Sequence, residues 1–335
     1  METMTKMERI DAALKGEEVD RVPISFWRHF YQQERNPSLL ADAMLAFQRD
    51  YEWDFVKVNP RASYHTEGWG NYYEYSDDPH RPPVRKRHAV HVEEDWARIA
   101  ELDIWKTDAL KQQLVLIELM KEGLQGENVY FLHTIFSPLA VAYRLAGHSK
   151  ERLAQAMESE PEELKGALEA ITNTFVKYVE ATLNAGASGD FYSPSKLASA
   201  DTMTPEQYDR FGIPYDLRVL AAAADRTGFN LLHLCGDHIF LEKLKSYPVD
   251  AISWDPTLSG NPELREGRQM SGKMVVGGLS DAVLASGKPE MVAEAVAREI
   301  AETGGRGIVI APGCVLPTNI PVEMLDAALA ALDGR

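Results

Sequence analysis

Cysteine is scarce in this chain, and each copy stands just past a short apolar run. The sequence holds two cysteines and nine histidines. Cys235 follows His233 with one residue between them, and Cys314 lies far downstream. One imidazole and two thiolates form a donor set typical of zinc. Because three protein ligands leave a fourth position open, as in catalytic zinc sites, the pattern predicts a zinc ion held by His233, Cys235 and Cys314 that activates a thiol.

The spacing of the first two ligands agrees with a strand. Residues two apart on a strand point to the same side, so His233 and Cys235 share one side while Leu232 and Leu234 take the other. A simpler interpretation is that both cysteines are buried core residues, which is common for free cysteine. The strand-end position and the neighbouring histidine favour the metal site.

Short apolar runs alternate with helical patterns along most of the chain. The expected strands are Val22–Trp27, Asp54–Val58, Val129–Thr134, Gly189–Ser193, Asn230–Cys235, Ala251–Trp254, Met274–Gly278 and Gly307–Ala311. Alternating strands and helices predict a parallel sheet, and this number of strands predicts an α/β fold of the (β/α)8 TIM-barrel type. An open doubly wound sheet is the alternative. Barrel enzymes build their active sites at the C-terminal ends of the strands, which would gather the three zinc ligands at one mouth.

The remaining segments predict helices and one long excursion. Clear helical periodicity appears in Pro161–Asn184, Pro205–Thr227, His238–Lys245, Lys288–Thr303 and Pro321–Leu332. The amphipathic segment Lys6–Gly16 predicts an N-terminal helical cap over the bottom of the barrel. Residues around 60–100 form a long excursion that includes the proline- and arginine-rich segment Ser76–His88. No domain boundary is evident, so we expect residues 1–335 to form a single domain.

The composition restricts the possible partners. The formal charge is −16, which argues against nucleic acid, whose phosphates require a basic surface, and against anionic membranes. The opening residues lack the apolar core of a secretory signal, and the apolar runs are shorter than the roughly 20 residues of a membrane-spanning helix. We therefore expect a cytoplasmic protein with reduced thiols.

Several motifs are similar to those of one enzyme family. They include Asp20-Arg21-Val22-Pro23-Ile24, Phe136-Ser137-Pro138-Leu139, His233-Leu234-Cys235-Gly236 and Ala311-Pro312-Gly313-Cys314. On these residues, and over most of its length, the chain resembles the uroporphyrinogen decarboxylase superfamily. Within it, the chain is more similar to the zinc methyltransferase branch, the methylcobamide:coenzyme M methyltransferases. The resemblance implies a (β/α)8 barrel in which His233, Cys235 and Cys314 hold zinc.

The same resemblance implies a reaction and its partners. A methyl group would pass from a methylated corrinoid, carried by a corrinoid protein or free as methylcobalamin, to a small-molecule thiol acceptor such as coenzyme M. Coordination to zinc turns a thiol into the nucleophilic thiolate at neutral pH. The sequence leaves open the acceptor, for which tetrahydrofolate is another candidate, and also the primary methyl source and the oligomeric state.

The decarboxylase branch of the family matches less well. Its arginine-rich motif after the first strand is not found in residues 27–35, and Lys57-Val58-Asn59-Pro60 replaces the stretch that would carry its aspartate. Near the last strand its Gly-His-Gly becomes Gly313-Cys314-Val315. A decarboxylase acting on a porphyrinogen stays one alternative, and its supply of arginines would be Arg28, Arg35 and Arg61. A non-catalytic corrinoid- or tetrapyrrole-binding protein is another.

Further residues near strand ends or in the excursion are candidates for binding the substrate or cofactor. They are Asn59, His65, Trp69, Asp190, Tyr192, Asp255 and Gly278. Asp190, Asp237 and Asp255 are also candidates to accept the thiol proton or to occupy the fourth zinc position. His133 ends an expected strand, where barrel enzymes place residues that face the mouth.

Overall fold

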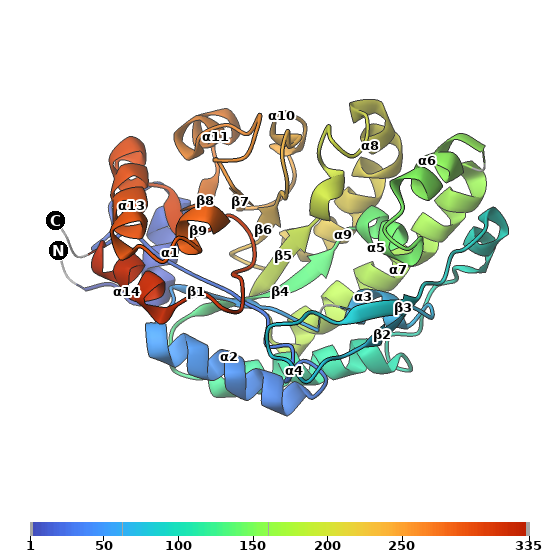
Figure 1. The fold of residues 1–335 in the computed structure, drawn as a ribbon, viewed down its shortest axis with the longest axis horizontal. Coiled ribbons are helices and arrows are strands. Elements are labelled where there is room, and N and C mark those ends of the chain that lie inside the picture. The colour runs from blue at the N-terminus through green and yellow to red at the C-terminus, as the bar shows by residue number, and fades with distance from the viewer. Residues whose placement is uncertain (1–2, 62, 160, 333–335) are drawn as a thin grey trace.

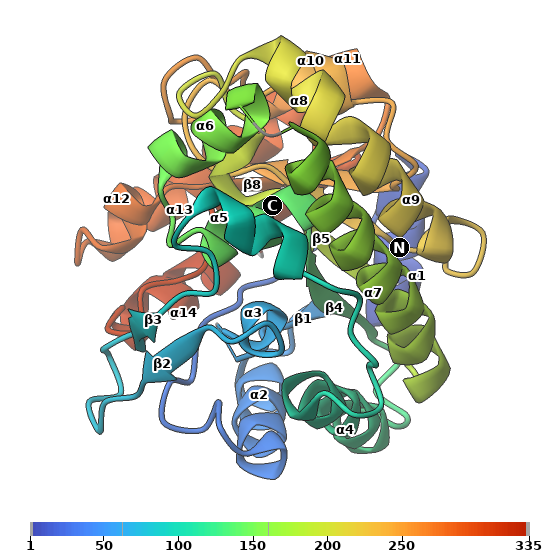
Figure 2. The same cartoon turned by 90° about the vertical axis from the view of Figure 1, so that its right-hand side faces the viewer.

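The strands form a parallel sheet that curls around one axis. The computed structural model describes residues 3–61, 63–159 and 161–332. Seven strands pair in parallel in the order β1-β4-β5-β6-β7-β8-β9, and helices lie outside them (Figures 1 and 2). The strands are β1 (Phe55–Val58), β4 (Tyr130–Phe136), β5 (Gly189–Ser193), β6 (Leu231–His233), β7 (Ala251–Trp254), β8 (Met274–Leu279) and β9 (Ile308–Pro312).

An extended segment, residues 22–28, closes the sheet between β9 and β1. The Ser25 N–H donates to the Ile310 carbonyl oxygen at 3.0 Å, and the Asp54 N–H donates to the Ile24 carbonyl oxygen at 2.9 Å. The strand predicted here is in place but makes only isolated bridges, because the Ile24 N–H donates to the Asp54 carboxylate at 2.8 Å instead of to a neighbouring strand. The predicted (β/α)8 fold is confirmed, with an irregular first strand.

Helices cover the outside of the sheet. The α-helices are α1 (Lys6–Leu14), α2 (Pro37–Tyr51), α3 (Tyr64–Glu67), α4 (Asp108–Gly123), α5 (Pro138–Leu145), α6 (Lys150–Ser159), α7 (Pro161–Ala185), α8 (Pro205–Phe211), α9 (Ile213–Ala224), α10 (Leu241–Leu244), α11 (Leu264–Ser271), α12 (Asp281–Leu284), α13 (Pro289–Thr303) and α14 (Val322–Ala330). Two 3-10 helices are η1 (Glu93–Arg98) and η2 (Ser195–Leu197). Within the described residues, no helix combines the length and the apolar character needed to cross a bilayer.

Two predicted helices differ from the observed ones. The predicted helix Pro205–Thr227 is divided at Gly212 into α8 and α9, since Pro214 has no N–H with which to continue the helical hydrogen bonds. The predicted helix His238–Lys245 shrinks to α10. Its first residue, His238, adopts a left-handed backbone with φ of 48°, which is incompatible with a right-handed helix.

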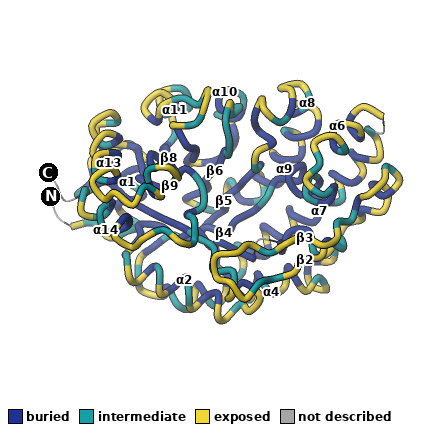
Figure 3. Tube along the Cα trace, in the orientation of Figure 1, coloured by how far each residue is buried: buried dark blue, intermediate teal, exposed yellow. Residues whose placement is uncertain are grey.

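Helix α1 lies across the N-terminal ends of the strands. Its Ile10 and Ala13 share an apolar cluster with Phe55, Leu132 and Met274, which point into the barrel from three strands. Figure 3 shows the sheet as a continuous buried layer surrounded by partly exposed helices. Because this cluster fills the lower barrel, space for a ligand remains toward the C-terminal ends of the strands.

The excursion after β1 carries a hairpin that the sequence analysis did not anticipate. Strands β2 (Tyr72–Glu74) and β3 (Val84–Arg87) pair in antiparallel fashion at the outer edge of the molecule (Figure 2). The loop between them reaches the segment after β9, where His80 Nδ1 lies 3.1 Å from Thr318 Oγ1. The excursion therefore extends along the C-terminal side of the barrel.

Candidate active site

The three predicted zinc ligands lie together at the barrel mouth. His233 ends β6, Cys235 follows two residues later, and Cys314 comes two residues after β9. One ligand atom from each residue lies within 4.8 Å of the other two, and the two Sγ atoms are 4.0 Å apart. Strands β6 and β9 are separated by β7 and β8 in the sheet. Only the curvature of the barrel brings their ends together.

Hydrogen bonds orient the histidine and distinguish the two thiols. His233 Nδ1 lies 3.2 Å from Ser253 Oγ on the adjacent strand β7, which leaves Nε2 for the thiols. Hydrogen bonds from Cys235 and then from His233 hold the pKa of Cys314 well below the usual thiol value. The same bond to Cys314, together with burial, raises the pKa of Cys235. One thiol therefore ionises easily, and the second requires a further positive charge, which a divalent cation provides.

The geometry of the three side chains fits zinc. Tetrahedral coordination with Zn–S distances of about 2.3 Å places two thiolate sulfurs about 3.8 Å apart, close to the 4.0 Å between Cys235 and Cys314. Metal-bound histidines usually bond a polar partner through the other ring nitrogen, as His233 does with Ser253. These residues would hold zinc with one coordination position free for a substrate.

A cavity of about 170 Å³ inside the barrel mouth opens onto this cluster. Its lining consists of Trp27, His29, Lys57, Asn59, Pro60, Thr134, Phe136, Arg144, Phe191, Ser193, Ser195, His233, Cys235, Cys314 and Val315. Aromatic rings form much of the wall, and the lining contains no aspartate or glutamate. Lys57 and Arg144 are its two cationic side chains other than histidine.

Lys57 is an unusual residue in this cavity. Its ammonium group lies 4.7 Å from the centre of the Phe191 ring and donates a hydrogen bond to Asn59 Oδ1. Burial lowers the pKa of Lys57 to about 7, although the nearby Cys314 thiolate opposes this shift. In the sequence, Lys57 stands out only as a departure from the decarboxylase pattern. Alternation along β1 from the inward-facing Phe55 would have placed its side chain inside the barrel.

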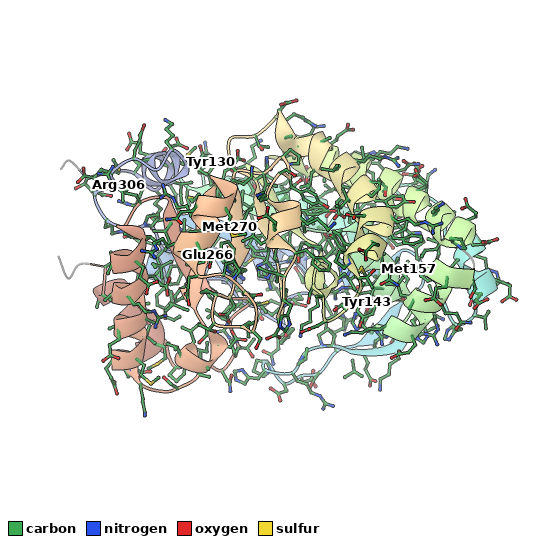
Figure 4. The ribbon with its side chains drawn as sticks, turned by 90° about the horizontal axis from the view of Figure 1, so that it is seen from above. Tyr130, Tyr143, Met157, Glu266, Met270 and Arg306 are labelled. Atoms are coloured by element: carbon green, nitrogen blue, oxygen red, sulfur yellow. The ribbon has the colours of Figure 1, made fainter. Side chains whose placement is uncertain are left out.

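A larger cavity of about 560 Å³ also borders the cysteine pair. It shares four residues with the smaller cavity, namely Arg144, Ser195, Cys235 and Cys314, and it is otherwise lined by polar groups such as His148, Lys196 and Asp237. Tyr143, another lining residue, is labelled in Figure 4 beside Met157 of α6. The two cysteines thus line both cavities.

Several predicted binding residues do lie near the cluster. Asn59 lines the smaller cavity. His65 is buried behind the wall, with its ring 4.2 Å from that of Phe136. Asp255 lies against the backbone beside Cys314, since a Cβ atom on Gly313 would come within 2.5 Å of the aspartate side chain.

Three other predicted contacts, Asp190, Tyr192 and Gly278, do not line either cavity. Phe191 points into the barrel, so its neighbours Asp190 and Tyr192 face the helices; the Tyr192 hydroxyl donates to Asp216 at 2.8 Å. Gly278 lies against α13, where an added Cβ would come within 2.6 Å of Glu299. Alternation along a strand, which the sequence shows, would have excluded Asp190 and Tyr192 once one inward residue was known.

Two further residues also lie away from the cavity. Trp69 Nε1 donates to the Ala100 carbonyl at 2.7 Å, so this ring anchors the excursion. His133 faces α7, where its Nε2 lies 3.1 Å from the Tyr178 hydroxyl. Burial lowers the pKa of His133 to about 3, so the ring is neutral. Conversely, the sequence did not predict Arg144 as a cavity residue, because its position at the barrel mouth depends on how helix α5 packs against the rest of the protein.

Comparison with known proteins identifies the family. The family model described as Uroporphyrinogen decarboxylase (URO-D) matches residues 5–334. The chain belongs to the uroporphyrinogen decarboxylase family. A uroporphyrinogen decarboxylase from a Geobacter species is 28% identical over 177 residues, which cover 51% of this chain and 49% of that protein. The chain thus spans about half the length of this relative.

Two other family comparisons extend over the whole chain. The methylcobamide:CoM methyltransferase of Methanosarcina mazei is 23% identical over 352 residues, 97% of each protein. The solved structure of a methyltransferase from Methanosarcina mazei superposes with a TM-score of 0.79 at 22% identity, covering 98% of both chains. The structural match shows a shared fold along the entire barrel.

Proposed function

We propose that this family member is a zinc-dependent methyltransferase. It moves a methyl group from a methylated corrinoid, carried by a partner protein or free as methylcobalamin, to a thiol such as coenzyme M. The observation that carries the proposal is the cluster of one imidazole and two thiols within 4.8 Å at a cavity wall. The full-length match to a methylcobamide:CoM methyltransferase supports a methyltransferase activity.

The side chains around the cluster have separate roles in this proposal. Zinc supplies a means of keeping an incoming thiol as its nucleophilic thiolate at neutral pH. His233, Cys235 and Cys314 would hold the ion, and Ser253 fixes the imidazole ring. The aromatic wall limits access of water, which strengthens electrostatic interactions inside. The positive charge of Arg144 in that wall favours an anionic thiolate over a neutral thiol.

Two cavities that meet at the sulfur pair suit a reaction with two substrates. The acceptor would occupy the smaller cavity inside the barrel. The methyl donor would approach through the larger cavity, which is more polar. This arrangement would let the acceptor sulfur and the donor methyl group meet beside the cysteine pair.

The decarboxylase alternative has weaker support. None of its three candidate arginines lines the smaller cavity. Arg61 forms an ion pair with Glu67 at 2.9 Å, and Arg28 donates to the Thr318 carbonyl at 2.7 Å. Arg35 stacks on the ring of Tyr75. The three arginines proposed to bind the carboxylates of a porphyrinogen therefore do not converge on this cavity.

Metal analysis and a demethylation assay test the proposal together. We expect the purified protein to contain one zinc per chain and to demethylate methylcobalamin with one or more thiols from a panel, with tetrahydrofolate tested alongside. Cys235→Ser, Cys314→Ser and His233→Asn should each lose zinc and activity. His238→Asn is the matched control, because His238 lies near the motif but pairs with Asp201 at the surface.

The outcomes separate the alternatives. Protein without bound metal, or with full activity after chelation, contradicts the zinc mechanism. Carbon dioxide release from uroporphyrinogen would favour the decarboxylase. Cobalamin binding without demethylation would favour a non-catalytic binding protein.

A further inference from the structure

Arg144 stands at the junction of the two cavities and has no acidic partner among the described residues. Its guanidinium lines both cavities. The guanidinium donates a hydrogen bond to the neutral hydroxyl of Ser195, at 3.2 Å. No ion pair to Arg144 occurs in the part of the chain that the structure describes. An arginine side chain placed in a cavity wall remains charged, and its charge is costly there unless an anion accompanies it.

The surroundings hold the guanidinium in a fixed place. The guanidinium carbon lies 4.6 Å from the centre of the Phe136 ring, which forms one side of its slot. Ser195 adopts a left-handed backbone with φ of 58°, a conformation that is rare outside glycine. This strained residue presents its hydroxyl to Arg144. The main chain of Arg144 is also held in place, because Asn71 Nδ2 donates a hydrogen bond to the Arg144 carbonyl oxygen at 3.0 Å.

The charge of the smaller cavity contrasts with that of the whole protein. The chain contains 51 aspartate and glutamate residues and has a formal charge of −16, yet no aspartate or glutamate of the described residues lines the smaller cavity. Lys57 in the same wall also has no carboxylate partner among the described residues, and it donates to the neutral Asn59 amide. A guanidinium that keeps its charge, in a wall without an acidic partner, forms a site for an anionic ligand.

The volume limits the size of that ligand. The cavity measures about 170 Å³, whereas pockets for drug-sized ligands span roughly 300–1,000 Å³. A small molecule with one thiol and one acidic group fits this space. A folate-sized acceptor does not.

We propose that Arg144 is the specificity-determining residue for the methyl acceptor, binding a carboxylate, sulfonate or phosphate group of a small thiol while the sulfur reaches the cysteine pair. This inference rests on the proposed function for the identity of the reaction. The guanidinium presents several donors in one plane, which suits an oxyanion better than a single ammonium group does. Ser195 acts as a positioning residue that keeps this plane directed into the cavity.

A matched pair of thiols tests the assignment. We would compare 2-mercaptoethanesulfonate with 2-mercaptoethanol, which have the same carbon chain and differ in the acidic group, using methylcobalamin as donor. In Arg144→Gln we expect the KM for 2-mercaptoethanesulfonate to rise about 10- to 100-fold with little change in kcat, as the loss of a charge-assisted pair implies. The KM for 2-mercaptoethanol should change less than about twofold, within the range of surface substitutions.

Controls separate a specific role from general damage. Arg144→Lys keeps the charge but loses the planar group, so its KM should fall between those of wild type and Arg144→Gln. Arg210→Gln is the matched control, because Arg210 also stacks on a phenylalanine, at 5.0 Å from the Phe211 ring, but is exposed on α8. Zinc content and the thermal midpoint of each variant should equal those of wild type.

Calorimetric titration of the purified protein with each thiol, without a donor, gives a readout independent of turnover. Tighter binding of 2-mercaptoethanesulfonate that Arg144→Gln abolishes supports the assignment, even if no thiol is methylated and the proposed function fails. Equal KM values and equal affinities of the wild type for the two thiols would overturn the assignment of Arg144. An equal rise in KM for both thiols in Arg144→Gln would overturn it as well.

Discussion

Replacing Asp190 with asparagine is expected to stabilise the fold at alkaline pH. Neither carboxylate oxygen of this buried side chain has a hydrogen-bond partner among the described residues. Burial raises the pKa of Asp190 from 3.8 to about 8, because an interior of low polarity disfavours the charged form. The substitution Asp190→Asn keeps the size of the side chain and removes its ionisation.

The size of this stability change follows from the difference between the pKa of Asp190 in the folded protein and its pKa in the unfolded chain. Between about pH 4 and pH 8 the folded protein keeps the Asp190 proton while the unfolded chain has lost it. The free energy of unfolding of the wild type therefore falls as the pH rises through this window. Each pKa unit is worth about 1.4 kcal/mol, so roughly four units set an upper bound of ~6 kcal/mol. We expect Asp190→Asn to gain about 2–4 kcal/mol at pH 8 and nearly nothing at pH 4.

Urea unfolding of both proteins at several pH values measures this difference. Asp216→Asn is the matched control, because Asp216 is equally buried but accepts hydrogen bonds from three tyrosine hydroxyls, those of Tyr192, Tyr208 and Tyr247, at 2.6–2.8 Å. Loss of these charge-assisted bonds should destabilise the control at pH 8 by about 1–3 kcal/mol. If the stability of Asp190→Asn parallels that of the wild type from pH 4 to pH 8, the reasoning about this carboxyl group is refuted.

Three further substitutions test other parts of the structure. Ser253→Ala should weaken zinc binding about 10- to 100-fold in a competition with a chromophoric chelator, because its hydroxyl orients the histidine ligand; unchanged affinity would argue against that role. Gly278→Ala should lower the free energy of unfolding by about 1–3 kcal/mol, since φ is 102° and the new Cβ would come within 2.6 Å of Glu299. The zinc content of Gly278→Ala should equal that of wild type, and a loss of zinc would indicate that Gly278 contributes to the metal site. Arg9→Met should lower the free energy of unfolding in urea by about 3 kcal/mol, because it removes one cation, 2.6 Å away, from the buried Asp54 carboxylate. A free energy of unfolding equal to that of wild type would show that the remaining partner of Asp54 is sufficient.

The location of the candidate metal centre could be predicted from local patterns. Apolar runs marked the strands, and the ligand types and the two-residue spacing of His233 and Cys235 indicated one side of one strand end. The rule that barrel active sites lie at the C-terminal strand ends then placed Cys314 beside them. The 4.0 Å between the two Sγ atoms agrees with that expectation.

Two of the other predicted contacts, Asp190 and Tyr192, lie away from the cavity for one physical reason. A position near a strand end does not tell which side of the strand faces the barrel. On β5 the side chain of Phe191 points into the barrel, so those of Asp190 and Tyr192 point toward the helices. The hairpin β2–β3 was not predicted, because its short strands, Tyr72–Glu74 and Val84–Arg87, are rich in polar and charged residues and carry no apolar alternation.

The sequence by itself determined the alternation of strands and helices, the barrel class and the three side chains suited to a soft metal, since each of these depends on residue type and local spacing. Only the tertiary structure decided that an irregular segment closes the barrel, that Lys57 and Arg144 enter a cavity without acids, and that Asp190 lies outside it. Closure and helix packing are long-range effects, and the space they leave between distant strand ends has no signature in any single stretch of the chain.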